Sequence, residues 1–329
     1  MELIDFSNVL EVCVMYKKLF IVFLVIAALI FAGCSTGPAD NPQDEPAQSV
    51  STTGDADGGY PVTFVDSLGR EISIEEKPDK VISLSPAITE ILFAIGAGEQ
   101  VVGVTDYCDY PEEALAKPKV GGFEDPNVEL IIESEPDLIF VAAGIQEELA
   151  RHYEGFGIKV ISLDAETVEQ VLTNIQLAGM ATGNVTEATE LVEEMESRIN
   201  KVVDTVAQVS HRPTVFFEVW DDPLMTAGPG SFIDDLLRLA GGQSIAYDAA
   251  ERFAQFSLEV LLERDPEIYL IQDHAHQPED VMARSGYEGL SAVQQGRVAA
   301  VKDDLVTLPG PRLVEGLEII AQILHPDLF

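Results

Sequence analysis

The chain has 329 residues and is strongly acidic, with 57 aspartate and glutamate residues against 19 lysine and arginine residues and a formal charge of −38. This charge argues against nucleic acid or an anionic lipid surface as a partner. Two of the three cysteines precede the expected folded part, which excludes a disulfide framework within it.

An apolar segment near the start predicts export. Two lysines precede Leu19–Ala32, a run of fourteen apolar residues without a charge. The run is shorter than the roughly 20 residues that span a membrane and is typical of a signal peptide, with an uncleaved anchor as the alternative. It ends in Phe-Ala-Gly-Cys, which resembles a lipoprotein processing site in which Cys34 becomes the lipidated first residue. We predict a signal peptide over residues 1–33, with Met15 as an alternative start, and anchoring by lipid at the outer face of the cell membrane.

A tether follows this cysteine. Residues 34–59 contain no aromatic side chain and are rich in Pro, Gly, Ser and Asp. Such a segment cannot bury a core, so we expect a flexible tether with a reach of roughly 25–30 Å. About 270 residues remain beyond it, enough for two lobes that each have a core of their own.

The first lobe, over residues 60–183, alternates strands with helices. Tyr60–Ile74 is expected to form a β-hairpin around a Leu-Gly turn. Strands are expected at Val81–Leu84, Val101–Val104, Leu138–Ala142 and Lys159–Leu163, and helices at Ile88–Ile95, Val128–Ser134, Glu147–Phe156 and Thr167–Ala181. This alternation predicts parallel βαβ units, whose binding loops follow the carboxyl ends of the strands.

A long amphipathic helix is predicted next, over residues 184–210. Its apolar residues recur three and four positions apart and therefore share one face: Ala188, Leu191, Val192, Met195, Ile199, Val202, Val203 and Val206. Asn184 followed by Glu187 predicts a side-chain cap at its start, and Pro213 prevents continuation beyond its other end. At 1.5 Å per residue the helix is roughly 35–40 Å long, about the diameter of a small domain.

The second lobe, over residues 211–329, follows the same scheme. Strands are expected at Thr214–Val219, Ile268–Ile271 and Val298–Val301, and helices at Phe232–Leu239, Leu258–Arg264 and Arg312–Leu324.

The two flanks of the long helix repeat each other. Asn127–Phe140 aligns without a gap on Ser257–Leu270, and Ile88–Gly98 is similar to Phe232–Gly242. Two copies, each more than a hundred residues long, exclude a solenoid. We predict an α/β fold in which two Rossmann-like lobes are joined by a single long rigid α-helix, with a ligand cleft between the lobes.

These pieces resemble a known family. The segment SLSPAITEILFAIGAGEQVVGVTDYCDYP, followed by GGFEDPNVELIIESEPDLI, is similar to substrate-binding proteins of the cobalamin and iron-siderophore ABC importers. The resemblance covers Val81 to the carboxyl terminus, and the Asp-Tyr-Cys-Asp-Tyr-Pro run is most similar to the cobalamin-binding branch. It implies that ligand sits in the cleft between two lobes joined by one rigid helix.

The resemblance also implies ligand contacts. Tyr107 and Phe123 match positions that place aromatic side chains against the corrin in the first lobe. Phe253 is the best match for the facing aromatic of the second lobe, Trp220 lies on a strand-end loop that reaches the cleft, and Asp304 matches a polar contact to the corrin amides. Flat apolar faces with a few polar groups suit a broad macrocycle, although each aromatic has ordinary core packing as its alternative interpretation.

Two histidines follow a strand of the second lobe. By the repeat, the loop of Asp273, His274 and His276 faces the cleft, where imidazole and carboxylate could bind a transition metal or contact cobalt or haem iron. The i, i+2 spacing is weak for a metal site, and the first lobe offers no cluster that completes four ligands. Solvated loop histidines are the favoured interpretation. Cys108 is interpreted as a small buried residue within its turn and not as a ligand.

The repeat places Glu129 on Glu259, each near the start of an equivalent helix. A carboxylate there is favoured by the positive end of the helix, which is a purely structural interpretation. The resemblance implies a second role, because matched glutamates on the two lobes engage arginines on the two halves of the permease.

The predicted function is that of a monomeric, lipid-anchored protein that captures a corrinoid and delivers it to an ABC permease with ATP-binding subunits. A ferric siderophore or haem is the alternative ligand. An extracytoplasmic metal-dependent enzyme is disfavoured, because the sequence contains no phosphate-binding Gly-rich loop with lysine, no G-x-S-x-G and no H-E-x-x-H motif. Neither an enzymatic activity nor a resident cofactor is predicted.

Overall fold

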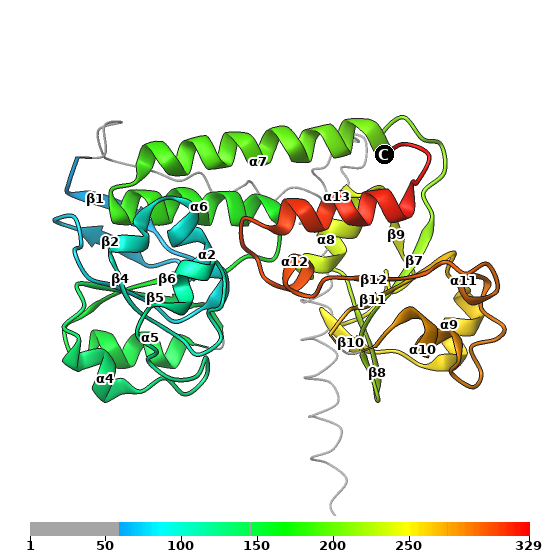
Figure 1. The fold of residues 1–329 in the computed structure, drawn as a ribbon, viewed down its shortest axis with the longest axis horizontal. Coiled ribbons are helices and arrows are strands. Elements are labelled where there is room, and N and C mark those ends of the chain that lie inside the picture. The colour runs from blue at the N-terminus through cyan, green and yellow to red at the C-terminus, as the bar shows by residue number, and fades with distance from the viewer. Residues whose placement is uncertain (1–58, 145, 275) are drawn as a thin grey trace, which may run out of the picture. The chain divides into compact units, whose positions relative to one another are not determined.

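Figure 1 shows the fold in a computed structural model, which describes residues 59–144, 146–274 and 276–329. The predicted signal peptide, Cys34 and all but the last residue of the predicted tether lie outside these residues. Within the described ranges, no helix is both long enough and apolar enough to cross a membrane.

The amino-terminal lobe begins with a β-hairpin, as predicted, and continues as alternating strands and helices. Its elements are β1 (Val62–Val65), β2 (Glu71–Ile74), β3 (Val81–Ser83), α2 (Pro86–Ala94), the 3-10 helix η1 (Ala97–Glu99), β4 (Val101–Val104), α3 (Glu112–Leu115), α4 (Val128–Glu133), β5 (Leu138–Ala142), α5 (Glu147–Glu154), β6 (Lys159–Leu163) and α6 (Val168–Thr182). The predicted strands and helices are all present, with ends that differ by at most two residues.

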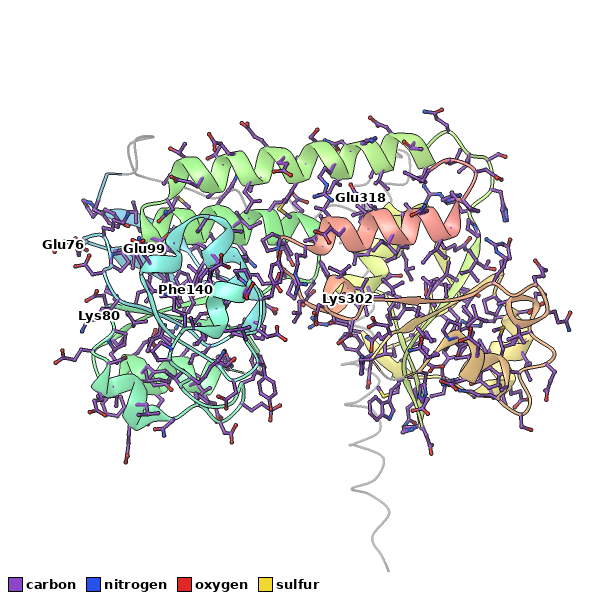
Figure 2. The ribbon with its side chains drawn as sticks, viewed as in Figure 1. Glu76, Lys80, Glu99, Phe140, Lys302 and Glu318 are labelled. Atoms are coloured by element: carbon purple, nitrogen blue, oxygen red, sulfur yellow. The ribbon has the colours of Figure 1, made fainter. Side chains whose placement is uncertain are left out.

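Four of these strands form a parallel sheet in the order β4-β3-β5-β6. β3 is buried along its whole length, and so is β5 except at its last residue, because helices cover both faces of the sheet. Phe140, labelled in Figure 2, is one of the fully buried side chains of β5. Since parallel strands all end at one edge, the loops after β3, β5 and β6 leave the sheet side by side.

The long helix α7 (Val185–Val206) has the predicted apolar face buried or half-buried. Figure 1 shows α7 running along α6 and α13, and it contacts both. Gly179 of α6 allows close approach, because an added Cβ there would lie 2.4 Å from the Cβ of Ala188. Towards the other end, Arg198 donates hydrogen bonds of 3.0 and 2.7 Å to Glu318 of α13, which Figure 2 labels. α7 is thus fixed to an element of each lobe.

The predicted side-chain cap of this helix is wrong. Asn184 occupies the N-cap position, but its side chain makes no capping hydrogen bond. Because α6 and α7 are separated by a very tight turn, the Asn184 amide oxygen is directed elsewhere and accepts a hydrogen bond of 3.4 Å from Gln100 Nε2. The amide therefore contributes to the contact between this turn and the end of η1.

The carboxyl-terminal lobe contains the predicted strands and helices together with several that were not predicted. Its elements are β7 (Thr214–Asp221), β8 (Leu224–Ala227), α8 (Phe232–Leu239), β9 (Gln243–Ser244), β10 (Phe253–Gln255), α9 (Leu258–Arg264), β11 (Ile268–Gln272), α10 (Pro278–Met282), α11 (Ser291–Gln294), β12 (Val298–Val301), α12 (Asp304–Thr307) and α13 (Leu313–Leu324).

The sheet of this lobe differs from the expectation of parallel strands alone. β7, β11 and β12 are parallel, but β8 and β10 extend the sheet on the other side with antiparallel pairing. The segment predicted as a loop after Val219 is instead a hairpin, in which Asp221 pairs with Leu224 across a two-residue connection. A proline in that connection disfavoured a strand in the sequence, although proline is compatible with a turn between strands.

The hydrophobic core is shared between the lobes. The largest cluster of buried apolar side chains runs from α2 and α6 through α7 to α8 and α13, and includes Ile91, Ile175, Met195, Leu237 and Leu317. Two smaller clusters lie on the remaining face of each sheet. The expectation that each lobe has a core of its own therefore holds only for these outer clusters.

The sequence repeat is a repeat of backbone structure. The side chains of Asn127 and Ser257 cap α4 and α9 by accepting, at 3.1 Å, the backbone N–H three residues further on. Both helices are followed by a left-handed residue, Glu135 with φ of 49° and Asp265 with φ of 40°. These matching turns lead into β5 and β11, which are the equivalent strands of the two sheets.

A buried histidine predicts a pH dependence of stability. His325 follows α13 and is buried, and its Nε2 has no hydrogen-bond partner in the part of the chain that the structure describes. Burial lowers the pKa of His325 from its ordinary value. The unfolded chain therefore takes up a proton near the ordinary pKa of about 6.5 that the folded chain does not, so stability is lost as the pH falls through this value.

We expect the free energy of unfolding to fall more between pH 7.5 and pH 5.5 in the wild type than in His325→Gln, as measured by urea titration. The exposed His152→Gln provides the control and should keep the wild-type dependence. Equal pH dependence in wild type and His325→Gln would contradict the assignment to His325.

Candidate functional site

A cavity lies where the carboxyl edge of the first sheet meets the second lobe. It has a volume of about 230 Å³. The first lobe supplies most of its wall, and one loop of the second lobe supplies the rest: Ser85, Pro86, Ala87, Ile88, Ile91, Phe123, Ala142, Ala143, Leu163, Asp164 and Asn174, with Thr307, Leu308 and Pro309. This is the location expected for a ligand in an open α/β sheet. The volume is below the range usual for whole ligand pockets, so the cavity is a recess and not an enclosing site.

One buried amide holds three parts of the cavity wall together. Gln146 accepts a hydrogen bond of 2.7 Å from the Ala142 N–H and donates to the carbonyl oxygens of Leu84 and Phe123, at 2.7 and 2.6 Å. Its full burial makes these bonds costly to break. Gln146 therefore positions the loop that carries Phe123, which is half-buried and lines the cavity.

The loop after β4 presents Tyr107 to solvent. The Tyr107 side chain is 65% exposed, whereas the adjacent Cys108 is fully buried, as predicted. The Cys108 sulfur lies 3.1 Å from the hydroxyls of both Thr89 and Thr105, and its carbonyl accepts a hydrogen bond of 2.7 Å from Lys119. These contacts fix the turn and leave the tyrosine ring outside the core.

Both aromatic residues expected from the second lobe lie on strands, and the predicted loop position of Trp220 is therefore wrong. Trp220 is in β7 and pairs with Met225 of β8, and its indole N–H donates to the carbonyl of Asp222 at 3.0 Å. Phe253 begins β10 and pairs with Ala227 of β8. About half of each ring is exposed, so neither is an ordinary core residue.

A buried ion pair joins the two lobes. Glu90 of α2 and Arg312, which precedes α13, form a two-pronged contact whose Nε–Oε2 distance is 2.9 Å. The Arg312 guanidinium also lies over the ring of Tyr110, 3.9 Å from its centroid. The side chains of Glu90 and Arg312 are only 4% and 10% exposed. Burial raises the pKa of Glu90, and the guanidinium of Arg312 opposes this by stabilising the carboxylate.

Asp304, predicted as a polar contact to the ligand, belongs to this network. Its carboxylate lies 3.6 Å from Arg312 Nη2 and 3.6 Å from Lys302 Nζ. The side chain remains 39% exposed, so it has one face on the ion pair and another on solvent. Figure 2 labels Lys302 beside α12, at the start of the segment that reaches the cavity.

Two further contacts between the lobes lie close to the cavity. Glu166, two residues beyond the cavity-lining Asp164, forms an ion pair with Arg252, which directly precedes Phe253. The first N–H of α6 donates to a carboxylate oxygen of Asp235 in α8 at 2.9 Å. Burial raises the pKa of Asp164, which the backbone N–H of Ala165 and the charge of Arg252 oppose.

The two histidines of the candidate metal loop are not brought together. His274 Nδ1 lies 3.5 Å from Asp303 Oδ2, whereas His276 Nε2 lies 3.0 Å from Asp221 Oδ2. Among the described residues, no group of three or more histidine, cysteine or carboxylate side chains is placed to hold a metal ion.

The two glutamates of the repeat are both exposed. Glu129 is the second residue of α4 and Glu259 the second residue of α9. Their role in docking stays a prediction.

Sequence reasoning missed the pair of Glu90 and Arg312, and it missed Gln146. One signal was available, because Glu90 is the only charged residue in a helix that is apolar apart from Thr89, and a charge on a buried helix requires a partner. The identity of the partner was not available, because it lies 222 positions further along the chain.

A model of the family described as periplasmic binding protein matches residues 81–305 of the chain. An uncharacterised ABC transporter substrate-binding lipoprotein of Bacillus subtilis is 32% identical over 313 residues, which cover 93% of this chain and 96% of the relative. A cobalamin-binding protein of Halobacterium salinarum is 29% identical over 313 residues, which cover 92% of this chain and 84% of the relative. Among solved structures, a periplasmic haem-binding protein of a Roseiflexus species in its apo form is similar, with a TM-score of 0.68 and 25% identity, over 76% of this chain and 99% of that one.

Proposed function

We propose that this chain, which belongs to the periplasmic binding protein family, captures a corrinoid outside the cell membrane and delivers it to an ABC importer. Membership of the family confirms the resemblance predicted from the sequence, and the two-lobed α/β architecture agrees with it. A role as the substrate-binding component of an ABC transporter follows from the family and its lipoprotein relative. The identity of the ligand as a corrinoid is the part of this function that we propose.

Exposed aromatic rings at the ends of the sheets support a flat ligand. Tyr107 of the first lobe and Trp220 and Phe253 of the second are between 49% and 65% exposed, although rings of this size usually bury most of their surface. A macrocycle with apolar faces and an amide fringe would cover these rings and find polar partners in groups such as Asp304. The relative from Halobacterium salinarum, which is named a cobalamin-binding protein, is the observation that carries the choice of a corrinoid.

Haem is the second candidate ligand, and the similarity to the haem-binding protein favours it. Haem is also a flat metal-containing macrocycle, so the same rings would suit it. Its edge carries carboxylates, which would lie unfavourably against a cavity wall that already contains Asp164.

Titration of the purified full chain in detergent with cobalamin, haem and a panel of ferric siderophores tests the proposal. Trp220 is the only tryptophan in the chain, so its fluorescence reports on one position of the proposed site. We expect cobalamin to quench this fluorescence saturably. Replacing Tyr107 and Phe253 together by alanine should weaken binding about tenfold or more, because ring contacts contribute about 0.5–1.5 kcal/mol each beyond the area they bury.

Tyr247→Ala is the matched control. The Tyr247 ring is similarly exposed, at 63%, but it stacks on Arg264, 5.0 Å from its guanidinium carbon, and it is not one of the ligand contacts that the resemblance implies. Its removal should leave cobalamin affinity unchanged. Binding of a siderophore or haem without binding of cobalamin would overturn the corrinoid assignment and leave the family assignment intact.

A further inference from the structure

The carboxyl ends of two neighbouring strands place an imidazole beside a carboxylate. His274 follows β11 and Asp303 follows β12, and these strands are parallel neighbours with Gln272 opposite Val301. The Asp273 N–H donates to the Val301 carbonyl and the Asp303 N–H to the Asp273 carboxylate, each at 3.0 Å. The two strand ends are therefore held together, and His274 stands beside Asp303.

The pair of His274 and Asp303 lies close to the cavity. The carbonyl of Asp303 accepts hydrogen bonds from the N–H of Thr307, at 3.0 Å, and from its hydroxyl, at 2.9 Å. Thr307 is part of the cavity wall. The histidine and its carboxylate are thus one helical turn from the surface that a ligand in the cleft would cover.

The two nitrogens of His274 have different surroundings. Nδ1 faces Asp303 at 3.5 Å, while Nε2 makes no hydrogen bond to any group among the described residues. About half of the ring, 48%, is exposed. Metal-ligating histidines commonly direct one ring nitrogen to a carboxylate and bind the metal with the other, because the carboxylate fixes the tautomer and makes the open nitrogen more basic. The contact of 3.5 Å in this protein is an ion-pair contact and not a hydrogen bond, and it places Asp303 where it can support the ring when Nε2 binds a metal.

We propose that His274 Nε2 is an axial ligand for the cobalt of a corrinoid whose own nucleotide base does not occupy that position. The step is a ligand exchange: a Co–N bond forms, a cobalt-bound water leaves, and neither the oxidation state nor the number of protons changes. Four in-plane nitrogens come from the macrocycle, so one protein ligand completes the site, and no cluster of three protein ligands is needed. This inference rests on the proposed function and specifies which corrinoid form the cleft would bind tightly.

His276 supplies a matched control within the same loop. Its Nε2 is occupied by Asp221 at 3.0 Å, at the end of β7 and not of β12. The experiment uses the full chain in detergent with cobinamide, a corrinoid that lacks the nucleotide loop, in its Co(II) form. Electron paramagnetic resonance then resolves an axial nitrogen, because coupling to one ¹⁴N nucleus splits each cobalt line into three.

We expect the threefold splitting in the wild type and in His276→Ala, and its loss in His274→Ala and His274→Gln. Cobinamide affinity should fall at least about tenfold in the two His274 variants, and about tenfold in Asp303→Asn through the lost support of the ring. Binding of cobinamide without nitrogen splitting in the wild type, or splitting that survives in a folded His274→Gln variant, would overturn the axial ligand and leave the proposed function standing. Failure of the wild type to bind any corrinoid would overturn both.

Discussion

Replacing Arg312 by alanine is expected to reduce the free energy of unfolding by about 3–5 kcal/mol, because it leaves Glu90 buried without a partner. Glu90 is 4% exposed and receives both prongs of the guanidinium, and no other cation among the described residues forms an ion pair with it. The variant also removes the cation from the ring of Tyr110 and from Asp304. Urea unfolding of wild type and variant at pH 7 measures the loss.

Two controls separate the buried charge from the loss of a side chain. Replacing both partners by methionine should restore much of the stability, because an apolar pair of similar volume carries no desolvation cost. Arg151→Ala removes an ion pair with Glu147 that is largely exposed, and should cost less than about 1 kcal/mol. A loss in Arg312→Ala no larger than that of Arg151→Ala would contradict the role given to Glu90.

The ion pair of Glu90 and Arg312 also connects the two lobes, at a place away from the long helix. α7 is packed against α6 and α13 and shares one continuous core with them. The contact of α2 with the loop before α13 is a second connection, and it is close, since a Cβ added at Gly310 would lie 3.3 Å from a carboxylate oxygen of Glu90. Separate connections between the lobes resist rotation about any one of them. We therefore expect the contacts between the lobes, as well as the helix, to limit their relative motion.

Elements whose stability is local were predictable from the sequence. α7 has a long apolar stripe with period 3.6, and its predicted burial is confirmed. β5 and β11 are apolar runs between clear turn signals, and the repeat made each a check on the other. In these segments the local pattern and the tertiary environment favour the same structure, which is the condition for a reliable prediction.

What sequence reasoning missed depends on partners that are distant in the chain. β8 and β10 are only four and three residues long and become strands because they pair with β7 and with each other. The Asn184 amide was expected to cap its own helix but contacts Gln100, which the fold brings to it. In the candidate site, the aromatic positions came from the family resemblance, whereas Gln146 and the buried ion pair required the fold. Short polar contacts of this kind leave no periodic signal.

The exposed glutamates of the repeat carry the second large prediction. Replacing Glu129 and Glu259 together by alanine is expected to leave cobalamin affinity nearly unchanged and to reduce uptake and permease binding about tenfold or more. Both carboxylates stand at the second position of equivalent capped helices, one in each lobe, so the protein presents a matched pair of charges. A permease with two similar halves can meet such a pair with one arginine on each half, and arginine–carboxylate contacts fix orientation as well as adding affinity.

Glu133 and Glu263 make a control that differs in position alone. They lie on the same two helices, are aligned by the same repeat, are exposed, and carry the same charge. Their double alanine variant removes as much negative charge as the other, but from the opposite ends of α4 and α9, and should transport normally. The helix dipole contributes about 0.3–1 kcal/mol at each amino-terminal site, so urea unfolding should find the Glu129 and Glu259 variant only slightly destabilised. Equal loss of uptake in both double variants would assign the effect to net charge. Loss of cobalamin binding in the variant of Glu129 and Glu259 would assign the effect to the cleft. Either result would show that these two glutamates do not dock the permease.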